Sequence, residues 1–181
     1  KNNFQIALEM RIRLRDALAN GEKKKIFIKY GNYNLNIAQE RIGESYMEMG
    51  RMYQVDGQYK EALEYAKKDE EIISKYNPKN ISGLAYAYYD QGVCYYHLGL
   101  QEKVAGNEDT AMENWKLAVE KLKKALKQNL ERRGDLAIDT IDNQEYLADT
   151  YQRISNEVGL MASDGYAKAN NMAKKLMGEN C

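Results

Sequence analysis

The chain has 181 residues, of which 30% are charged and one is proline, a composition typical of an all-helical domain. Its 27 basic and 27 acidic side chains cancel, which argues against a general nucleic-acid or membrane-surface role. No run of 18 apolar residues occurs, so we expect no membrane insertion. Because the sequence does not begin with Met, we expect a fragment or a processed form, and the compartment stays open between cytoplasm and cell envelope.

The first predicted helix covers residues 3–20, where apolar side chains recur every three or four positions. Asn20-Gly21 predicts a helix stop, and the apolar residues between 26 and 33 predict a further helical segment. We interpret residues 1–34 as part of a repeat whose first helix lies outside this sequence.

Two amphipathic helices are predicted next, over residues 35–55 and 58–76. Asp56-Gly57 predicts a tight turn between them. Asn77-Pro78 ends the second helix, because proline cannot continue it.

Small residues recur at matching places along these helices. Gly92 follows Gly50 by 42 positions, and Ala148 follows Gly92 by 56, which is 42 plus an insertion of 14. In the second helices, Ala118 follows Ala62 by the same 56 positions. Tyrosines flank the first two of these glycines at equal spacing: Tyr46 and Tyr53, then Tyr88 and Tyr95. Small residues beside large ones are what two closely packed helices require.

The second pair of helices is predicted over residues 81–98, ended by Gly99, and from about Thr110 to 132. Thr110 with Glu113 fits a capping box, and Ala105-Gly106-Asn107 fits a loop within the insertion. Cys94, inside the first of these helices, is expected to be a small buried apolar residue.

Asp135 is the expected N-cap of a third first-helix over 136–158. A final helix around Tyr166, Ala169 and Ala173 is expected to act as a C-terminal cap.

These spacings resemble the tetratricopeptide repeat, and the 42-residue period is similar to its kinesin-light-chain-like subclass. The resemblance implies an all-α fold, an α-solenoid in which antiparallel helix pairs form a right-handed superhelix. It implies one domain over residues 1–181. Its parts would be a partial repeat at 1–34, repeats at 35–80 and 81–134 with the insertion around 99–110, and a third repeat or cap at 135–181.

The resemblance also implies a concave groove lined by the first helices. The positions that match it are Met47, Arg51, Tyr86, Tyr89, Val93, Tyr96, His97, Glu145, Asp149 and Gln152. Tyrosine and methionine are good anchors for a peptide, and the carboxylates favour a neutral or basic segment. The alternative is that these tyrosines only pack between adjacent first helices.

His97 is the sole histidine, and it has no partners in a pattern typical of a metal site or a general base. No phosphate-binding loop is present either, so we expect no catalytic residues, cofactor or metal. The sequence therefore predicts a protein- or peptide-binding scaffold. A sensing portion of a larger signalling or transcription protein, or an accessory domain of an enzyme or envelope assembly, remains an alternative, and exposed solenoid ends could form a homo-oligomer.

Overall fold

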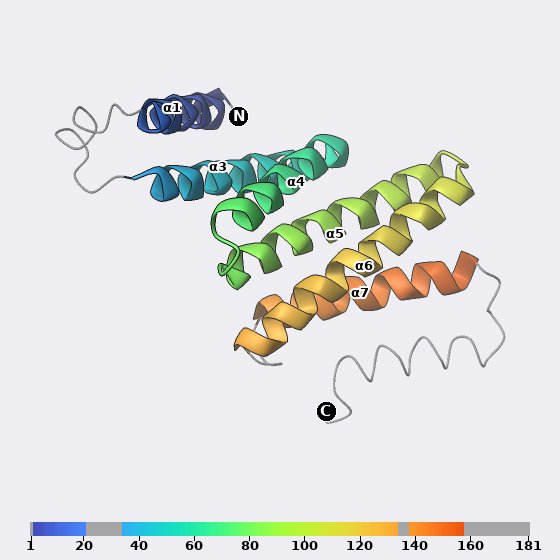
Figure 1. Cartoon of the computed structure of the whole chain (residues 1–181). Helices are drawn as coiled ribbons and strands as arrows, with labels where there is room; N and C mark the ends of the chain where they lie inside the picture. Colours follow the sequence, from blue (N-terminus) through green and yellow to red (C-terminus); the bar gives the residue numbers. More distant parts are fainter. Residues whose placement is uncertain (1, 21–33, 134–137, 158–181) are drawn as a thin grey trace. The chain divides into compact units, whose positions relative to one another are not determined.

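The computed structural model describes residues 2–20, 34–133 and 138–157, and all regular structure in these ranges is α-helical (Figure 1). The prediction of an all-α fold is therefore confirmed. The chain divides into two compact units, residues 1–84 and 85–181. The prediction of one domain stays a prediction, and the helices predicted around 26–33 and 166–173 lie outside the described residues, as does Asp135.

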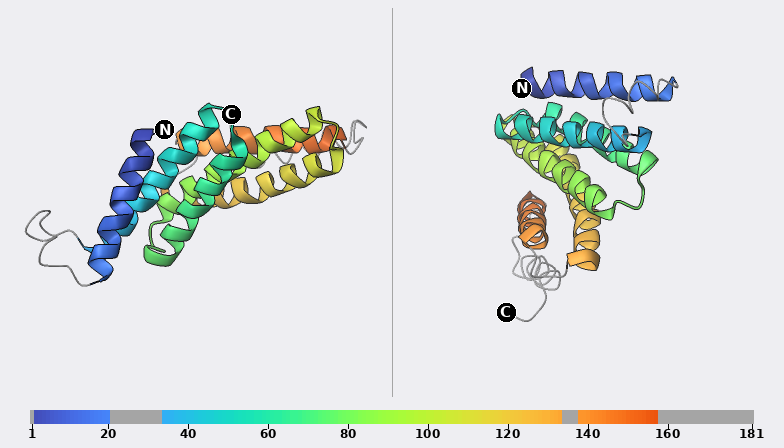
Figure 2. Two further views of the ribbon diagram at one scale, coloured as in Figure 1. Left: turned by 90° about the horizontal axis from the view of Figure 1, so that it is seen from above. Right: turned by 90° about the vertical axis from the view of Figure 1, so that its left-hand side faces the viewer.

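The first unit contains three described helices, α1 (Asn2–Ala19), α3 (Leu35–Val55) and α4 (Tyr59–Tyr76). Figure 2 shows α1 lying along α3. The buried side chains of Leu18 and Ala38 join these two helices. At the start of α3, the side chain of Asn34 accepts a hydrogen bond from the Ile37 backbone N–H at 3.0 Å, which satisfies one of the free amides of the first turn.

Helices α3 and α4 form an antiparallel hairpin that packs closely at Gly50. A Cβ atom at Gly50 would lie 3.4 Å from both the Ala62 carbonyl oxygen and the Tyr65 Cβ. Beside this contact the rings of Tyr53 and Tyr65 stack, with centroids 5.4 Å apart. The Lys68 ammonium lies 5.0 Å from the Tyr65 ring centroid, so the outer side of the stack is covered by a charge.

The second unit contains most of α5 (Ile81–Val104), together with α6 (Glu108–Arg133) and α7 (Ile138–Glu157). Helices α5 and α6 form a longer antiparallel hairpin (Figure 1). A Cβ at Gly92 would lie 2.6 Å from Leu122 Cγ, so only glycine allows this approach. Farther along, the buried indole of Trp115 lies against Gly99 and donates from Nε1 to the Tyr96 carbonyl at 3.3 Å.

The two hairpins repeat the same contacts at the predicted offsets. Gly92 is 42 positions after Gly50, and Leu122 is 56 positions after Ala66, whose backbone nitrogen lies 3.8 Å from a Cβ built at Gly50. A lysine also lies over a first-helix tyrosine in both hairpins: Lys68 over Tyr46, and Lys124 over Tyr88.

The turns of the two hairpins are equivalent as well. Gly57 and Gly106 both have a positive φ, +72° and +82°, which other residues rarely adopt. The residue after each glycine donates from its backbone N–H to a carbonyl five positions earlier, from Gln58 to Tyr53 and from Asn107 to Glu102, both at 2.9 Å. The loop predicted at 105–107 is therefore confirmed.

The 14-residue insertion lengthens both helices of the second hairpin by seven residues each. Helix α3 ends five residues after Gly50, whereas α5 ends 12 residues after Gly92. Helix α4 begins three residues before Ala62, whereas α6 begins 10 residues before Ala118. Seven residues are about two helical turns, so both helices keep the same face toward each other.

This extension corrects two predictions. Gly99 does not end a helix, because α5 continues to Val104 and the missing side chain instead makes room for Trp115. Thr110 does not cap a helix, because α6 already begins at Glu108 and Thr110 lies within its first turn. The acidic side chains of Glu108 and Asp109 suit this position, since a helix N-terminus carries partial positive charge.

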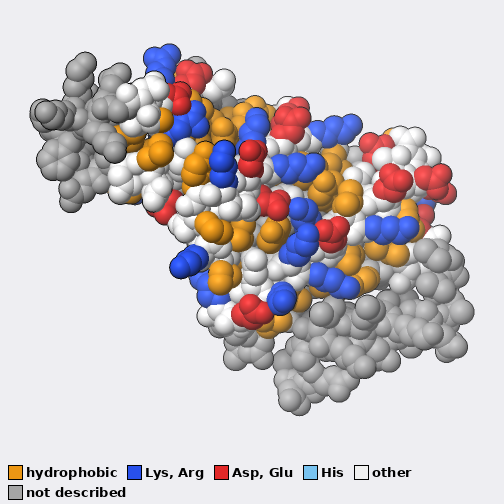
Figure 3. Space-filling view, in the orientation of Figure 1, with side chains coloured by type: hydrophobic (Ala, Val, Ile, Leu, Met, Phe, Trp, Pro, Cys, Tyr) orange, Lys and Arg blue, Asp and Glu red, His pale blue; other side chains and the backbone are white. Residues whose placement is uncertain are grey.

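Cys94 is fully buried in α5, as predicted. On the face drawn in Figure 3, acidic and basic side chains are interspersed, with hydrophobic side chains between them.

Candidate functional site

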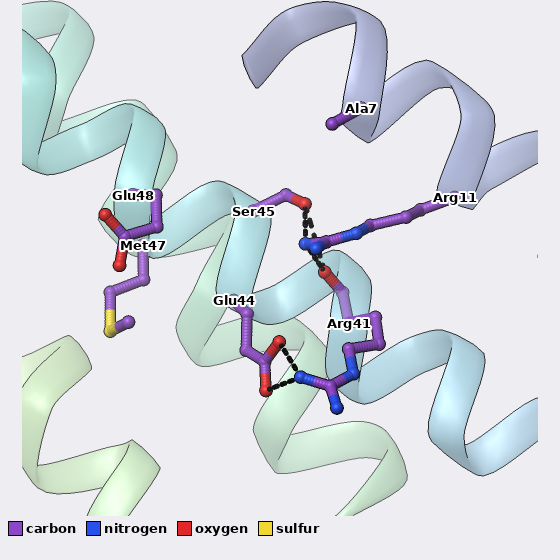
Figure 4. Close-up of a pocket in the computed structure, with 7 residues that line it drawn as sticks. All are labelled: Ala7, Arg11, Arg41, Glu44, Ser45, Met47 and Glu48. Carbon is purple, nitrogen blue, oxygen red and sulfur yellow. Dashed lines mark hydrogen bonds and ion pairs between the residues drawn. The ribbon is translucent and has the colours of Figure 1, made fainter. Parts of the chain in front are cut away.

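The predicted groove residues of the first unit, Met47 and Arg51, are both half-buried on α3. Met47 lines a pocket of about 360 Å³ between α1 and α3 (Figure 4). The other lining residues come from the same two helices: Ala7, Arg11, Arg41, Glu44, Ser45 and Glu48.

Most polar groups of this pocket bind one another. The Arg11 guanidinium reaches from α1 and donates from Nη1 to the Arg41 carbonyl at 2.7 Å and to the Ser45 hydroxyl. The Arg41 guanidinium forms an ion pair with Glu44 at 2.7 Å. Figure 4 shows these contacts on one side of the pocket, with Met47 and Glu48 on the other. The hydrogen bonds in this pocket therefore join α1 to α3. The groups left for a ligand are mainly the Met47 thioether and the Glu48 carboxylate.

The predicted residues of the second unit lie mostly between α5 and α7. Tyr86 donates from its hydroxyl to Asp139 Oδ2 at 2.9 Å, and Tyr96 donates to Asp149 Oδ2. Both pairs are 53 positions apart. Helices α5 and α7 therefore run parallel and in fixed register, as the first helices of consecutive repeats would.

The ring of Tyr146 on α7 lies at the centre of an aromatic cluster. Its centroid is 5.5 Å from Tyr96, 5.9 Å from Tyr89 and 6.2 Å from His97, each in an edge-to-face arrangement. Such pairs add about 0.5–1.5 kcal/mol beyond the burial of their surface. Val93 on α5 is also buried. The aromatic residues proposed for the groove therefore stabilise the contact between α5 and α7.

Burial and hydrogen bonding shift two titrating groups in this cluster. Burial lowers the pKa of His97 below its ordinary value, and the nearby Asp149 carboxylate only partly opposes the shift. Burial, and then the hydrogen bond to Asp149, raises the pKa of Tyr96 to about 12. Both rings are therefore neutral near pH 7, so the cluster presents no cation of its own.

A third polar contact lies at the tip of the long hairpin. Lys103 Nζ lies 2.5 Å from Glu157 Oε2 on α7 and 3.0 Å from Glu108 Oε1 on α6. The hydrogen bond to Glu157, followed by the one to Glu108, raises the pKa of Lys103. The three helices of the unit meet at this lysine.

Two predicted residues, Glu145 and Gln152, are exposed on α7. Asp149 is half-buried and has Arg153 3.9 Å from the same carboxylate oxygen that Tyr96 binds. A partner-binding role for any of these residues stays a prediction.

The sequence analysis did not identify three residues that make central contacts in the pocket and between α5 and α7: Tyr146, Asp139 and Arg11. A signal for Asp139 existed, since a tyrosine and an aspartate recur 53 positions apart at 86/139 and at 96/149. Arg11 had no such signal, because its partners are a backbone carbonyl and a serine.

No family model, curated protein or solved structure matches the chain. Within the described ranges, no group of three His, Cys, Asp or Glu side chains is placed to hold a metal ion. Of the helices that the structure describes, none has the length and apolarity needed to cross a membrane.

Proposed function

We propose that this chain is a tetratricopeptide-like repeat module that binds a protein or peptide segment and has no catalysis of its own. The observation that carries the proposal is the repetition of one hairpin contact, at Gly50 in α3/α4 and at Gly92 in α5/α6. Repeated helix hairpins are the unit from which α-solenoids are built, and their extended surfaces serve to bind other chains.

The parallel register of α5 and α7 supports the same proposal. In a solenoid, the first helix of one repeat packs beside the first helix of the next, and α7 has this position relative to α5. The solenoid itself, with a right-handed superhelix, is part of the proposal.

The residues proposed to meet the partner are those that remain accessible. Glu145 and Gln152 are exposed, and Met47 and Arg51 are half-buried. Because Asp149 already accepts a hydrogen bond from Tyr96, the preference for a neutral or basic partner rests mainly on Glu145.

The experiment is a pull-down from native lysate with the chain, a Met47→Ala/Glu145→Lys variant and a matched Met10→Ala/Glu131→Lys control. The control makes the same chemical changes at exposed positions on α1 and α6. We expect a protein that the chain and the control retain and the first variant loses, while helical circular dichroism stays equal. Equal retention by all three proteins would contradict the proposed surface.

A further inference from the structure

We propose that α7 is an exchangeable helix, and that the face it covers on α5 and α6 also binds α7 of a second copy of this chain. The proposal does not depend on the peptide-binding function above. It rests on how α7 is held, which differs from how α5 and α6 hold each other.

The buried face of α7 is polar. Among the α7 residues whose side chains the structure describes, six are buried, and Leu147 is the apolar one; the others are Thr140, Asn143, Gln144, Thr150 and Ser155. The buried side chains of α6, by contrast, are apolar except for Asn129. Burial of apolar surface is the main favourable term in helix packing, so α7 gains less from it than α6 does, and much of its apolar contact comes from the ring of Tyr146.

Two polar atoms at this contact lack partners among the described residues. The side-chain oxygen of Asn129 on α6 and the hydroxyl of Tyr151 on α7 are buried without a hydrogen bond, although Asn129 Nδ2 donates to the Asp139 carbonyl at 3.4 Å. Each such atom loses its hydration when the helices pack, and water restores it when they separate. These atoms therefore favour the open state of α7.

The polar groups that are satisfied give the contact its specificity. With its amide oriented to match its neighbours, Asn143 donates to the Leu122 carbonyl at 3.0 Å and accepts from the Leu126 N–H at 2.9 Å. These are backbone groups one turn apart on α6, so α6 itself forms part of the receptor for α7.

The helix that packs against α5 must also supply two carboxylates and an aromatic ring to the tyrosines of α5. Asp139 and Asp149 are ten residues apart and accept from two tyrosine hydroxyls, and Tyr146 fills the space among three rings. The occupant that fits is thus an amphipathic helix with acid, aromatic and acid at these spacings. Among the described helices, α7 has this pattern, so the occupant in trans is α7 of a second copy.

Opening of α7 would expose a row of aromatic side chains on α5: Tyr86, Tyr89, Tyr96 and His97. Large amphipathic rings of this kind dominate binding energies at protein interfaces. Exchange of an identical element between copies then restores every contact, which is why it is a low-cost route to a dimer.

The test uses a fluorescent peptide of residues 138–157 and the full chain. Leu147→Ala truncates the buried apolar side chain that the structure describes on α7. Thr150→Val replaces a buried hydroxyl whose described contact is the hydrogen bond that it donates to the Tyr146 carbonyl of its own helix, at 2.6 Å. We expect the peptide to bind Leu147→Ala at least about 30-fold more tightly than the unaltered chain, because the resident helix opens more often. Thr150→Val should bind it more weakly than the unaltered chain.

A control peptide with Asp139→Lys and Asp149→Lys should lose the binding. Hydrogen exchange of the unaltered chain should show faster exchange in α7 than in the second half of α6, and light scattering should show that Leu147→Ala forms more dimer. Binding of both peptides alike, no binding to Leu147→Ala, α7 protection equal to that of α6, or monomers at every concentration would overturn the proposal. The exchange measurement decides even if Leu147→Ala does not fold.

Discussion

Replacement of Gly99 by alanine is the sharpest test of the long hairpin. Alanine inside a helix is ordinarily more stable than glycine by about 0.5–1 kcal/mol. At Gly99, however, the new Cβ would lie 2.3 Å from Trp115 Nε1 and 2.5 Å from Cδ1, and the indole is rigid and 1% exposed. Overpacking costs about 1–3 kcal/mol, and displacing the indole also weakens its hydrogen bond to Tyr96, worth about 0.5–1.5 kcal/mol. We therefore expect a net loss of about 1–3 kcal/mol.

The matched control is Gly50→Ala in the short hairpin. There the nearest atoms would be 3.4 Å from the new Cβ, an ordinary contact distance, so the helix preference for alanine should prevail. We expect a gain of up to about 1 kcal/mol. Urea unfolding followed by circular dichroism measures both variants, and the emission of Trp115, the only tryptophan, reports on the long hairpin.

A double-mutant cycle identifies the cause of the loss. Trp115→Phe removes the indole atoms nearest to the new methyl group, so Gly99→Ala should become neutral or stabilising in that background. If Gly99→Ala costs the same with and without Trp115, or stabilises as much as Gly50→Ala, the packing argument is refuted.

Three further predictions concern the second unit. Burial lowers the pKa of His97, so the unfolded state binds more protons than the folded state as pH falls through about 6.5, and the free energy of unfolding should drop there. In urea unfolding at several pH values, His97→Phe should remove this dependence of the midpoint on pH. The pKa of Tyr96 is raised to about 12, so its stabilising contribution is complete below about pH 10 and is lost between about pH 10 and 12. In that range, Tyr96→Phe should make the free energy of unfolding less dependent on pH. Deletion of residues 98–104 together with 108–114 should leave a folded hairpin of the α3/α4 type, whereas deletion of either segment alone should lose more helical circular dichroism.

The hairpins could be predicted because their signal is local. A small residue flanked by tyrosines at fixed spacing marks the point where two helices approach, and Gly50 and Gly92 lie at such points in the structure. Two independent offsets, 42 in the first helices and 56 in the second, both match observed contacts. Helix α3 accordingly begins and ends at the predicted residues, 35 and 55.

The boundaries of the insertion were predicted wrongly because a glycine in a helical sequence can have either of two structural roles. Within a helix it can end the helix, or it can admit a large side chain from a neighbour, and the local sequence around Gly99 is compatible with both. Trp115, 16 positions later, decides in favour of the second. Only tertiary contact carries that information, and α6 correspondingly begins at Glu108, ahead of Thr110.

The candidate groove shows a similar ambiguity. A stripe of tyrosines at helical spacing suits both an open peptide-binding surface and a contact between parallel helices, since both need large rings with a polar end. The structure uses Tyr86 and Tyr96 in the second way, through hydroxyls that bind carboxylates. The exposed positions, such as Glu145, keep the first possibility for the proposed function.

Helix α6 meets its two neighbours by different physical means. Toward α5 it presents Trp115 and Leu122, whose burial is non-directional and supplies most of the stability of the hairpin. Toward α7 it presents backbone groups to the Asn143 amide, a directional contact whose net contribution is only about 1 kcal/mol per hydrogen bond.

Directional contacts set register more strictly than apolar ones. A shift of α7 by one turn would separate Tyr86 from Asp139 and Tyr96 from Asp149 at the same time, because both pairs share the offset of 53. An apolar face could accept such a shift by repacking. The polarity of the buried face of α7 therefore explains both its fixed register and its weak attachment. A helix with both properties can leave its site and be replaced by an identical helix.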